Sequence, residues 1–171
     1  MSQSPFIFGL AAFSGAGKTT LAEKLISYAA AKGLVISSIK HAHHKFEPDV
    51  VGKDSWRHRQ AGARQTLIAS ADRSALYTEN PVPHRPQLSD LLAQLGPCDW
   101  VLVEGFKTDP IVKCEVFDPA LGNEPLYPTD PHITAFICDE RDDSCALPQF
   151  QRDDVAGIFA HLQALSEGSH K

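Results

Sequence analysis

The sequence lacks a long apolar run, and this absence bears on where the protein resides. A transmembrane helix needs roughly 20 consecutive apolar residues, whereas the apolar stretch nearest the N-terminus covers only residues 6–13. The opening residues, Met-Ser-Gln-Ser-Pro, carry none of the basic charge that begins a secretory signal. We therefore expect no membrane segment, no export and a cytoplasmic location.

Paired cysteines are also missing. The four cysteines, Cys98, Cys114, Cys138 and Cys145, show no C-x-x-C spacing. The first three lie in or beside apolar runs, where a cysteine behaves as a small apolar residue. This pattern argues against a disulfide framework and against a zinc site, and it favours reduced thiols.

An excess of basic residues is absent as well. Lys and Arg number 16 against 21 Asp and Glu, and the net charge of −5 argues against general nucleic-acid binding. The charge is uneven, because residues 40–64 hold six Lys or Arg against three acids. A locally basic segment in an acidic protein suits a small polyanionic ligand such as a nucleotide. Each of these charges taken alone is also compatible with a solvated surface.

The order of the apolar segments predicts an α/β fold. Residues 6–13 form a short apolar run typical of a buried strand, residues 18–32 have helical spacing, and residues 34–39 favour a second strand. This βαβ unit predicts a doubly wound, mostly parallel sheet, and the length suits one domain over residues 1–171. Further strands are expected at residues 65–70, 74–79, 99–103, 111–117 and 133–138, and further helices at residues 53–63, 86–95 and 153–165.

A glycine-rich turn joins the first strand to the first helix. It reads Ala-Phe-Ser-Gly-Ala-Gly-Lys-Thr and matches the P-loop pattern G-x-x-x-x-G-K-[ST], except for Ala12 at the first position. Glycines adopt positive φ and let backbone N–H groups turn toward phosphates. Lys18 adds a positive charge, and Thr19 offers a hydroxyl to Mg²⁺. Because the turn lies between a strand and a helix, we predict a fold of the P-loop NTPase type. The expected nucleotide contacts are Ser14, Gly15, Ala16, Gly17, Lys18, Thr19 and Thr20.

A carboxylate is expected at the end of a strand beside the first one, where it can hold the water bound to magnesium. The run Trp-Val-Leu-Val-Glu-Gly delivers Glu104 at the carboxyl end of a buried strand, where ligands of open α/β sheets lie. Gly105 lets the backbone turn away, and Lys107 is close enough in sequence to reach the same site. The alternative is an ordinary surface glutamate at a strand end.

Asp54 is the second acidic candidate. It follows a loop that contains Gly52, and it is placed to bind magnesium directly or to orient an attacking water. It fits equally well as an acid in the first turn of a helix, where it complements the helix dipole. The sequence leaves both interpretations open.

A histidine cluster follows the second strand. His41, His43 and His44 stand beside Lys40, and neutral imidazole binds transition metals. No cysteine or second histidine group lies close in sequence to complete a tetrahedral site. We therefore favour a phosphate-facing or partner-facing basic loop over a metal site.

Three blocks of the sequence together resemble the MobB family, the molybdopterin-guanine dinucleotide biosynthesis proteins B. They are residues 8–20, residues 39–70 with Gly-Lys-Asp-Ser at 52–55, and residues 101–107, which read Val-Leu-Val-Glu-Gly-Phe-Lys. The resemblance is loose toward the C-terminus. The family also has alanine at the position of Ala12, so this departure from the general P-loop pattern is shared.

The resemblance implies a GTP-binding protein with slow hydrolysis that works beside the molybdopterin guanylyltransferase and other molybdenum cofactor enzymes. It also implies a homodimer. The broader class that includes dethiobiotin synthetase implies a magnesium set of Thr19, Asp54 and Glu104. The expected ligands are therefore GTP and Mg²⁺, and Lys18, Asp54 and Glu104 are the candidates for any weak GTPase chemistry.

One feature of many GTPases is missing. The sequence has no N-K-x-D run, the motif that commonly reads the guanine base. Asp139 follows the strand expected at residues 133–138 and is placed to read the base instead. No catalytic glutamine or arginine finger can be assigned, so we expect slow intrinsic turnover.

Two other functions are compatible with these residues. An ATP-dependent small-molecule kinase would share the P-loop and add a lid with paired arginines, and a metal carrier would use the histidine cluster. Comparison of the affinities for GTP and ATP distinguishes the kinase from a GTP-binding protein. Metal analysis of the purified protein tests the metal carrier. The candidate lid arginines are Arg57, Arg59, Arg64 and Arg73.

Overall fold

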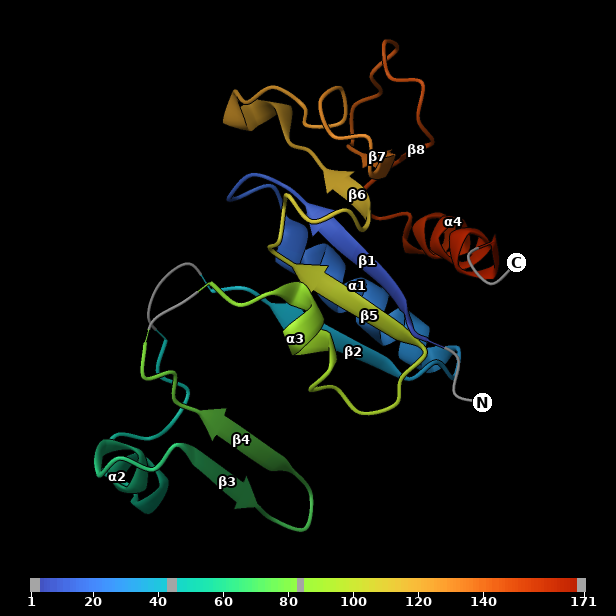
Figure 1. The fold of residues 1–171 in the computed structure, drawn as a ribbon. Helices are drawn as coiled ribbons and strands as arrows, with labels where there is room; N and C mark the ends of the chain where they lie inside the picture. The colour runs from blue at the N-terminus through green and yellow to red at the C-terminus, as the bar shows by residue number, and fades with distance from the viewer. Residues whose placement is uncertain (1–3, 43–45, 83–84, 169–171) are drawn as a thin grey trace. The chain divides into compact units, whose positions relative to one another are not determined.

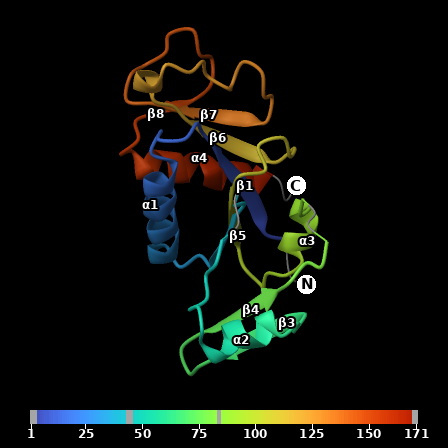
Figure 2. The ribbon, with the colours of Figure 1, turned by 90° about the vertical axis from the view of Figure 1, so that its left-hand side faces the viewer.

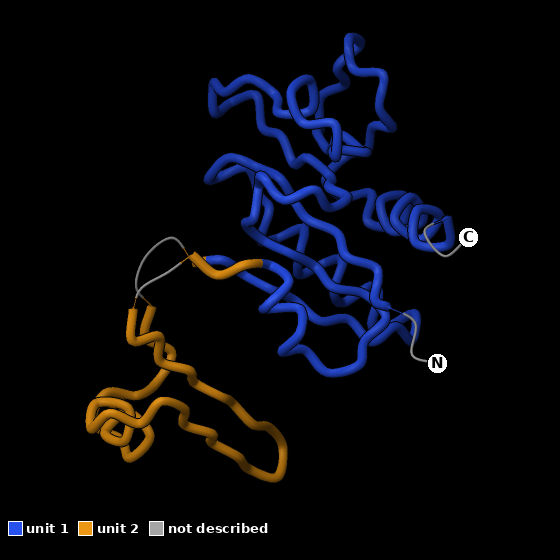
Figure 3. Tube along the Cα trace, in the orientation of Figure 1, with its two compact units in different colours: residues 1–41, 88–171 blue, residues 42–87 orange. Residues whose placement is uncertain are grey.

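The computed structural model describes residues 4–42, 46–82 and 85–168. The chain divides into two compact units, shown in Figure 3: unit 1 comprises residues 1–41 and 88–171, and unit 2 comprises residues 42–87. The sequence predicted one domain over residues 1–171, and that stays a prediction beside this division into units.

Unit 1 is built around a six-stranded sheet with the order β2-β5-β1-β6-β7-β8, in which every adjacent pair is parallel (Figure 1). Its strands are β1 (Phe6–Ala11), β2 (Ile36–Lys40), β5 (Trp100–Glu104), β6 (Val112–Val116), β7 (Ile133–Ile137) and β8 (Gln149–Phe150). Its helices are α1 (Lys18–Ala31), α3 (Leu88–Leu92) and α4 (Val155–Gly168), with a short 3₁₀ turn, η1, at Pro119–Leu121. The predicted doubly wound α/β fold, with a mostly parallel sheet of the P-loop NTPase type, is confirmed.

Helices cover both faces of this sheet (Figures 1 and 2). On one face, α1 and α4 pack against the larger apolar cluster, in which Phe8, Leu25 and Ile158 are almost fully buried. On the other face, Leu88 of α3 packs with Val101 of β5 in a smaller cluster. Both faces of β1 and β5 are covered, which accounts for the continuous apolar runs in their sequences. This pattern is expected of a buried parallel sheet.

The long excursion between β6 and β7 is held by a buried glutamate. Glu115 on β6 is fully buried, and its carboxylate accepts hydrogen bonds from the backbone N–H groups of Leu126 at 2.7 Å and Tyr127 at 2.8 Å. Removal from water raises the pKa of Glu115 above its ordinary value, while the two N–H donors act in the opposite direction. The segment between β6 and β7 is therefore tied back to the sheet.

Unit 2 contains a helix and a β-hairpin. Its elements are α2 (Asp54–Gln60), β3 (Gln65–Ala69) and the antiparallel β4 (Ser74–Thr78). The turn is closed by a hydrogen bond of 2.8 Å from the N–H of Ser70 to the carbonyl of Arg73. Arg59 forms ion pairs with Glu47 at 2.7 Å and with Glu79 at 2.6 Å, so charged contacts join separate segments of this unit. None of its described residues is buried.

The element boundaries differ modestly from the predicted ones. The helix expected at residues 86–95 is regular only over Leu88–Leu92, and 3₁₀-type hydrogen bonds continue the turn to Leu95. The sequence missed β8, because two residues are too few to show a period. Among the described residues, no helix is long and apolar enough to cross a membrane.

Candidate phosphate-binding site

The loop between β1 and α1 has the backbone geometry that the P-loop pattern requires. Gly15 has φ of 91° and Gly17 has φ of 87°, both in the left-handed region that favours glycine. Ala12 is only 2% exposed and belongs to the larger apolar cluster. A methyl group at this position is therefore accommodated within the core, which explains why the first glycine of the pattern can be replaced.

The start of α1 carries free donors. Gly17 is the N-cap of this 14-residue helix, and no side chain caps the helix there. The first N–H groups of a helix have no partner within the helix, and the dipole adds a partial positive charge at the same end. The predicted contact residues at this end, Ser14, Thr19 and Thr20, are all exposed. This combination can receive an anion.

Lys18 provides the central positive charge of the site. Partial burial of its ammonium lowers its pKa below the ordinary value, and the neighbouring charges of Lys107 and Lys40 act in the same direction. Only Glu104 acts against them, through its opposite charge. Three amines and one carboxylate thus influence one another, and a polyanionic ligand would relieve the repulsion among the amines.

Glu104 lies where the sequence predicted it. It is the last residue of β5, which pairs in parallel with β1 on one side and with β2 on the other. In these ladders it is level with Leu10 and with Lys40. Its carboxylate therefore belongs to the carboxyl edge of the central strands, beside the loop that begins after β1.

The turn after β5 depends on a close approach between two chain segments. Gly105 has φ of 99°, and a Cβ added there would lie 2.6 Å from the Cβ of His41. The N–H of His41 donates to the carbonyl of Glu104 at 2.8 Å, and its ring lies 4.9 Å from the ring of Phe106. His41 thus contributes to the packing of this edge, while His43 and His44 lie outside the described residues.

Lys107 connects this turn to the glycine-rich loop. Its Nζ lies 5.4 Å from the centroid of the Phe13 ring, within the range of a cation–π contact. The sequence placed Lys107 near the site only from its position in the chain. The contact with Phe13 gives that placement a geometric basis.

The predicted magnesium set is divided between the two units. Thr19, in the first turn of α1, and Glu104 belong to unit 1, whereas Asp54 opens α2 in unit 2 and is exposed. Hard oxygen ligands of this kind suit Mg²⁺, but the membership of Asp54 stays a prediction. In the described part of the chain, no three His, Cys, Asp or Glu side chains gather to hold a metal. The predicted set, with two carboxylates and a hydroxyl, does not require such a group.

Arg152 is the site residue that the sequence analysis missed. It follows β8, and its guanidinium binds the carboxylate of Asp139, with Nε at 2.7 Å and NH2 at 2.6 Å. Its NH1 lies 3.4 Å from Asp118 and would lie 3.8 Å from a Cβ on Gly17. Asp139 follows β7, at the place that the sequence proposed for reading a base, and its role stays a prediction. Because the sequence did not predict β8, it gave no position in the fold for Arg152.

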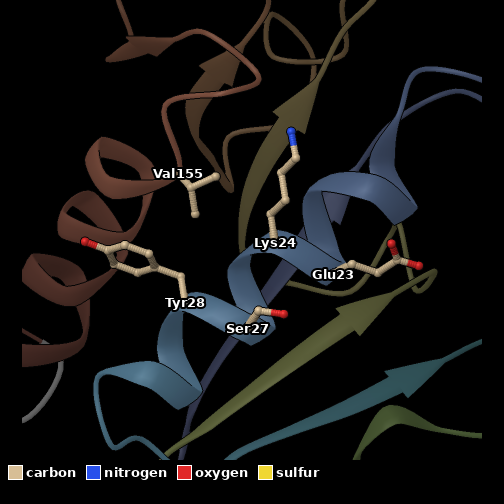
Figure 4. Close-up of a pocket in the computed structure, with 5 residues that line it drawn as sticks. All are labelled: Glu23, Lys24, Ser27, Tyr28 and Val155. Carbon is tan, nitrogen blue, oxygen red and sulfur yellow. The ribbon is translucent and has the colours of Figure 1, made fainter.

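A shallow pocket on the side of α1 contains no residue of the glycine-rich loop. Figure 4 shows Glu23, Lys24, Ser27 and Tyr28 projecting from α1, and Val155 from the start of α4. Lys24 also reaches Asp153 at 2.6 Å. This pocket is open and lined largely by carbon, so we assign it no part in binding phosphates.

Comparison with known proteins agrees with this geometry. Residues 7–139 match the family described as molybdopterin guanine dinucleotide synthesis protein B, MobB. The molybdopterin-guanine dinucleotide biosynthesis adapter protein of Haemophilus influenzae is 42% identical over 132 residues, covering 75% of this chain and 72% of its own. The adapter protein of the same name from Escherichia coli is 41% identical over 136 residues, covering 78% of each chain.

Solved structures extend the similarity over nearly the whole chain. The structure of Bacillus subtilis MobB has a TM-score of 0.69 at 25% identity and covers 93% of this chain and 96% of its own. A MobB homolog from Bacillus stearothermophilus has a TM-score of 0.69 at 23% identity and covers 95% and 98%, which by itself shows only the fold. Because the family model covers more than half of its residues and close relatives share 41–42% identity, the chain belongs to the MobB family.

Proposed function

We propose that this protein is a GTP-binding adapter with weak GTPase activity that assists the formation of molybdopterin guanine dinucleotide in the cytoplasm. One observation carries the proposal. Gly15 and Gly17, both with positive φ, lie between a buried strand and an uncapped helix that begins with Lys18. The biosynthetic process in the proposal comes from the relatives, which are named as adapter proteins in molybdopterin-guanine dinucleotide biosynthesis.

The triphosphate would be bound by three kinds of positive charge acting together. The backbone N–H groups at the start of α1 and the helix dipole favour an anion, and Lys18 adds a full charge. Lys107 and Lys40, whose charges already act on Lys18, extend the positive field around it. Binding would therefore weaken as salt screens these charges.

Hydrolysis would rest on positioning and electrostatics. Thr19, Glu104 and Asp54 are the residues proposed to hold Mg²⁺, directly or through its water, and the ion would neutralise charge that develops on the phosphates. Lys18 would stabilise the same charge, and Asp54 or Glu104 would orient the attacking water. Without an assigned glutamine or arginine finger, turnover is expected to be slow unless a partner accelerates it.

A homodimer is the proposed assembly, and unit 2 is the proposed interface. Among the described residues, seven of the nine large apolar side chains that stand well exposed belong to this unit. A two-stranded hairpin is marginally stable in water unless its apolar face is covered. A second copy of the chain, with the same apolar hairpin, would bury both faces. The seven are Phe46, Val50, Val51, Leu67, Ile68, Leu76 and Val82.

The partner enzyme is proposed to be the molybdopterin guanylyltransferase, with other molybdenum cofactor enzymes. An adapter bound to GTP would bring the nucleotide near the enzyme that uses its GMP moiety. Co-sedimentation of the purified protein with that enzyme, with GTP and with no nucleotide, addresses this part. Equal recovery of the complex without GTP would separate the adapter role from nucleotide binding.

The proposal is tested by titrating the purified protein with GTP and ATP, with and without Mg²⁺, and by repeating the titration on Lys18→Ala. We expect GTP to bind more tightly than ATP, and Lys18→Ala to lose at least about tenfold in affinity, the range for a lost charged contact. Lys32→Ala, at the opposite end of the same helix, is the matched control and should bind as the original protein does. A tenfold preference for ATP would favour the kinase alternative.

A further inference from the structure

A hollow of about 300 Å³ opens beside the glycine-rich loop. This volume is at the lower end of the range for small-molecule sites, about 300–1,000 Å³. Three segments meet there: the start of α1, the loop after β7, and the residues that follow β8. Its lining residues are Gly17, Thr20, Leu21, Lys24, Asp139, Arg152 and Asp153.

The hollow is continuous with the proposed phosphate site. Gly17 and Thr20 belong to both, since they lie in the glycine-rich loop and the first turn of α1 and also line the hollow. A nucleotide whose phosphates lie at the helix start must place its nucleoside on one side of the loop. The hollow supplies that space, at the carboxyl edge of the parallel strands, where ligands of such sheets bind.

Asp139 gives the hollow a defined hydrogen-bonding character. Its hydrogen bond to Arg152 holds the pKa of the Asp139 carboxyl below its ordinary value, so the group is ionised and only accepts hydrogen bonds. About half of its side chain is exposed, at 52%, so the carboxylate stays accessible to a ligand. Guanine presents two adjacent donors, the N1–H and the 2-amino group, whereas adenine presents an acceptor at N1. A fixed carboxylate therefore favours guanine.

Arg152 fixes this carboxylate in place. Its backbone N–H donates to Oδ1 of Asp139 at 3.1 Å, while its Nε donates to Oδ2 at 2.7 Å. Its NH1 extends toward Asp118 in the loop after β6. Two oxygens held by one residue cannot rotate freely, and a pre-oriented acceptor discriminates between ligands better than a mobile one.

We propose that this hollow is the base subsite of the nucleotide site, in which Asp139 determines specificity for guanine and Arg152 acts as its positioning residue. The proposal rests on the proposed function, because it assumes that a triphosphate occupies the loop beside Gly17. It gives the protein a means of reading guanine without an N-K-x-D run. Lys24 and Asp153, paired at 2.6 Å, also line the subsite.

The first test varies only the ligand, so it needs no altered protein. Affinities of the original chain are measured for GTP, ITP, ATP and inorganic triphosphate. ITP keeps the N1–H of guanine but lacks the 2-amino group. The subsite predicts that ITP binds at least about fivefold more weakly than GTP and that ATP binds more weakly still, because each lost donor leaves Asp139 with an unmade hydrogen bond. Equal affinity for GTP and ATP overturns the proposal.

The second test changes Asp139→Asn, which exchanges one acceptor for a donor. Xanthine has a 2-carbonyl where guanine has the 2-amino group, so the variant should lose at least about tenfold in GTP affinity and gain in XTP affinity. Asp143→Asn, on an exposed loop outside the hollow, is the matched control and should keep the GTP preference. Arg152→Ala should lower the ratio of GTP to ITP affinity, because Asp139 then loses the residue that orients its carboxylate.

The outcomes distinguish a failure of the base subsite from a failure of the phosphate site. If inorganic triphosphate binds and Lys18→Ala abolishes its binding, while Asp139→Asn leaves the GTP to XTP ratio unchanged, the base subsite is wrong and the phosphate site stands. If neither nucleotides nor inorganic triphosphate bind, the proposed function fails and the subsite fails with it. Should Asp139→Asn not fold, the ligand series on the original chain still decides.

Discussion

At the scale of single residues, the positive charge of Lys18 destabilises the nucleotide-free protein. Burial and the nearby charges of Lys107 and Lys40 lower its pKa from the ordinary 10.5. A lysine whose pKa falls on folding destabilises the protein at every pH below its folded pKa. This cost disappears as the pH rises from that value to 10.5, because the unfolded chain then binds more protons than the folded one. Nucleotide binding would offset the same cost.

Lys18→Met should therefore raise the thermal midpoint of the nucleotide-free protein while abolishing its affinity for triphosphate. Methionine keeps the apolar stem of the side chain and removes the charge. The gain over the original chain should shrink as the pH approaches 10.5. Melting curves between neutral and alkaline pH measure both effects. A variant that melts below the original chain at neutral pH would show that Lys18 stabilises the free protein.

At the scale of elements, the junction between β2 and β5 depends on Gly105. Gly105→Ala would place a methyl group 2.6 Å from the Cβ of His41 at a φ of 99°. We expect a loss of about 2 kcal/mol or more in the free energy of unfolding, from backbone strain and from the clash. Gly33→Ala is the matched control, because its φ of 86° is similar but nothing lies within 4 Å. It should cost about 1 kcal/mol, for strain alone. Urea unfolding of both variants measures the two losses, and their difference gives the cost of the clash with His41. Equal losses in the two variants would show that this clash costs nothing.

The elements also show what the sequence could predict. The apolar runs of β1 and β5 and the helical spacing of α1 place the loop and Glu104, because these signals are local. Arg152 was missed, since its contacts with Asp139 and Asp118 join residues 13 and 34 positions apart and no local period encodes them. The two strands of the unit 2 hairpin were predicted, but their placement in a separate unit was not. An apolar pattern predicts a strand but does not reveal which sheet the strand joins, and β3 and β4 form a sheet of their own.

At the scale of the whole molecule, the exposed apolar face of the hairpin bears on the number of subunits. Leu67 and Leu76 are directly opposite each other in the β3–β4 ladder, and 67% and 55% of their surfaces are exposed. Cross-strand apolar pairs of this kind stabilise a sheet when they are covered. Contiguous exposed apolar surface on a small protein marks an interaction site.

The double variant Leu67→Lys with Leu76→Lys should therefore convert the proposed dimer to a monomer of 18.6 kDa. Two charges on each hairpin would repel their counterparts and would remain unpaired if buried, which is costly. Sedimentation equilibrium over a range of concentrations gives the mass. Val35→Lys, at an apolar position of unit 1 that is 57% exposed, should leave the mass unchanged.

A double variant that keeps the mass of the original chain would show that the interface lies outside the hairpin. An original chain that is monomeric would rule out the dimer itself. Because the glycine-rich loop lies in unit 1, the monomeric variant should still bind GTP, so assembly and nucleotide binding can be measured apart.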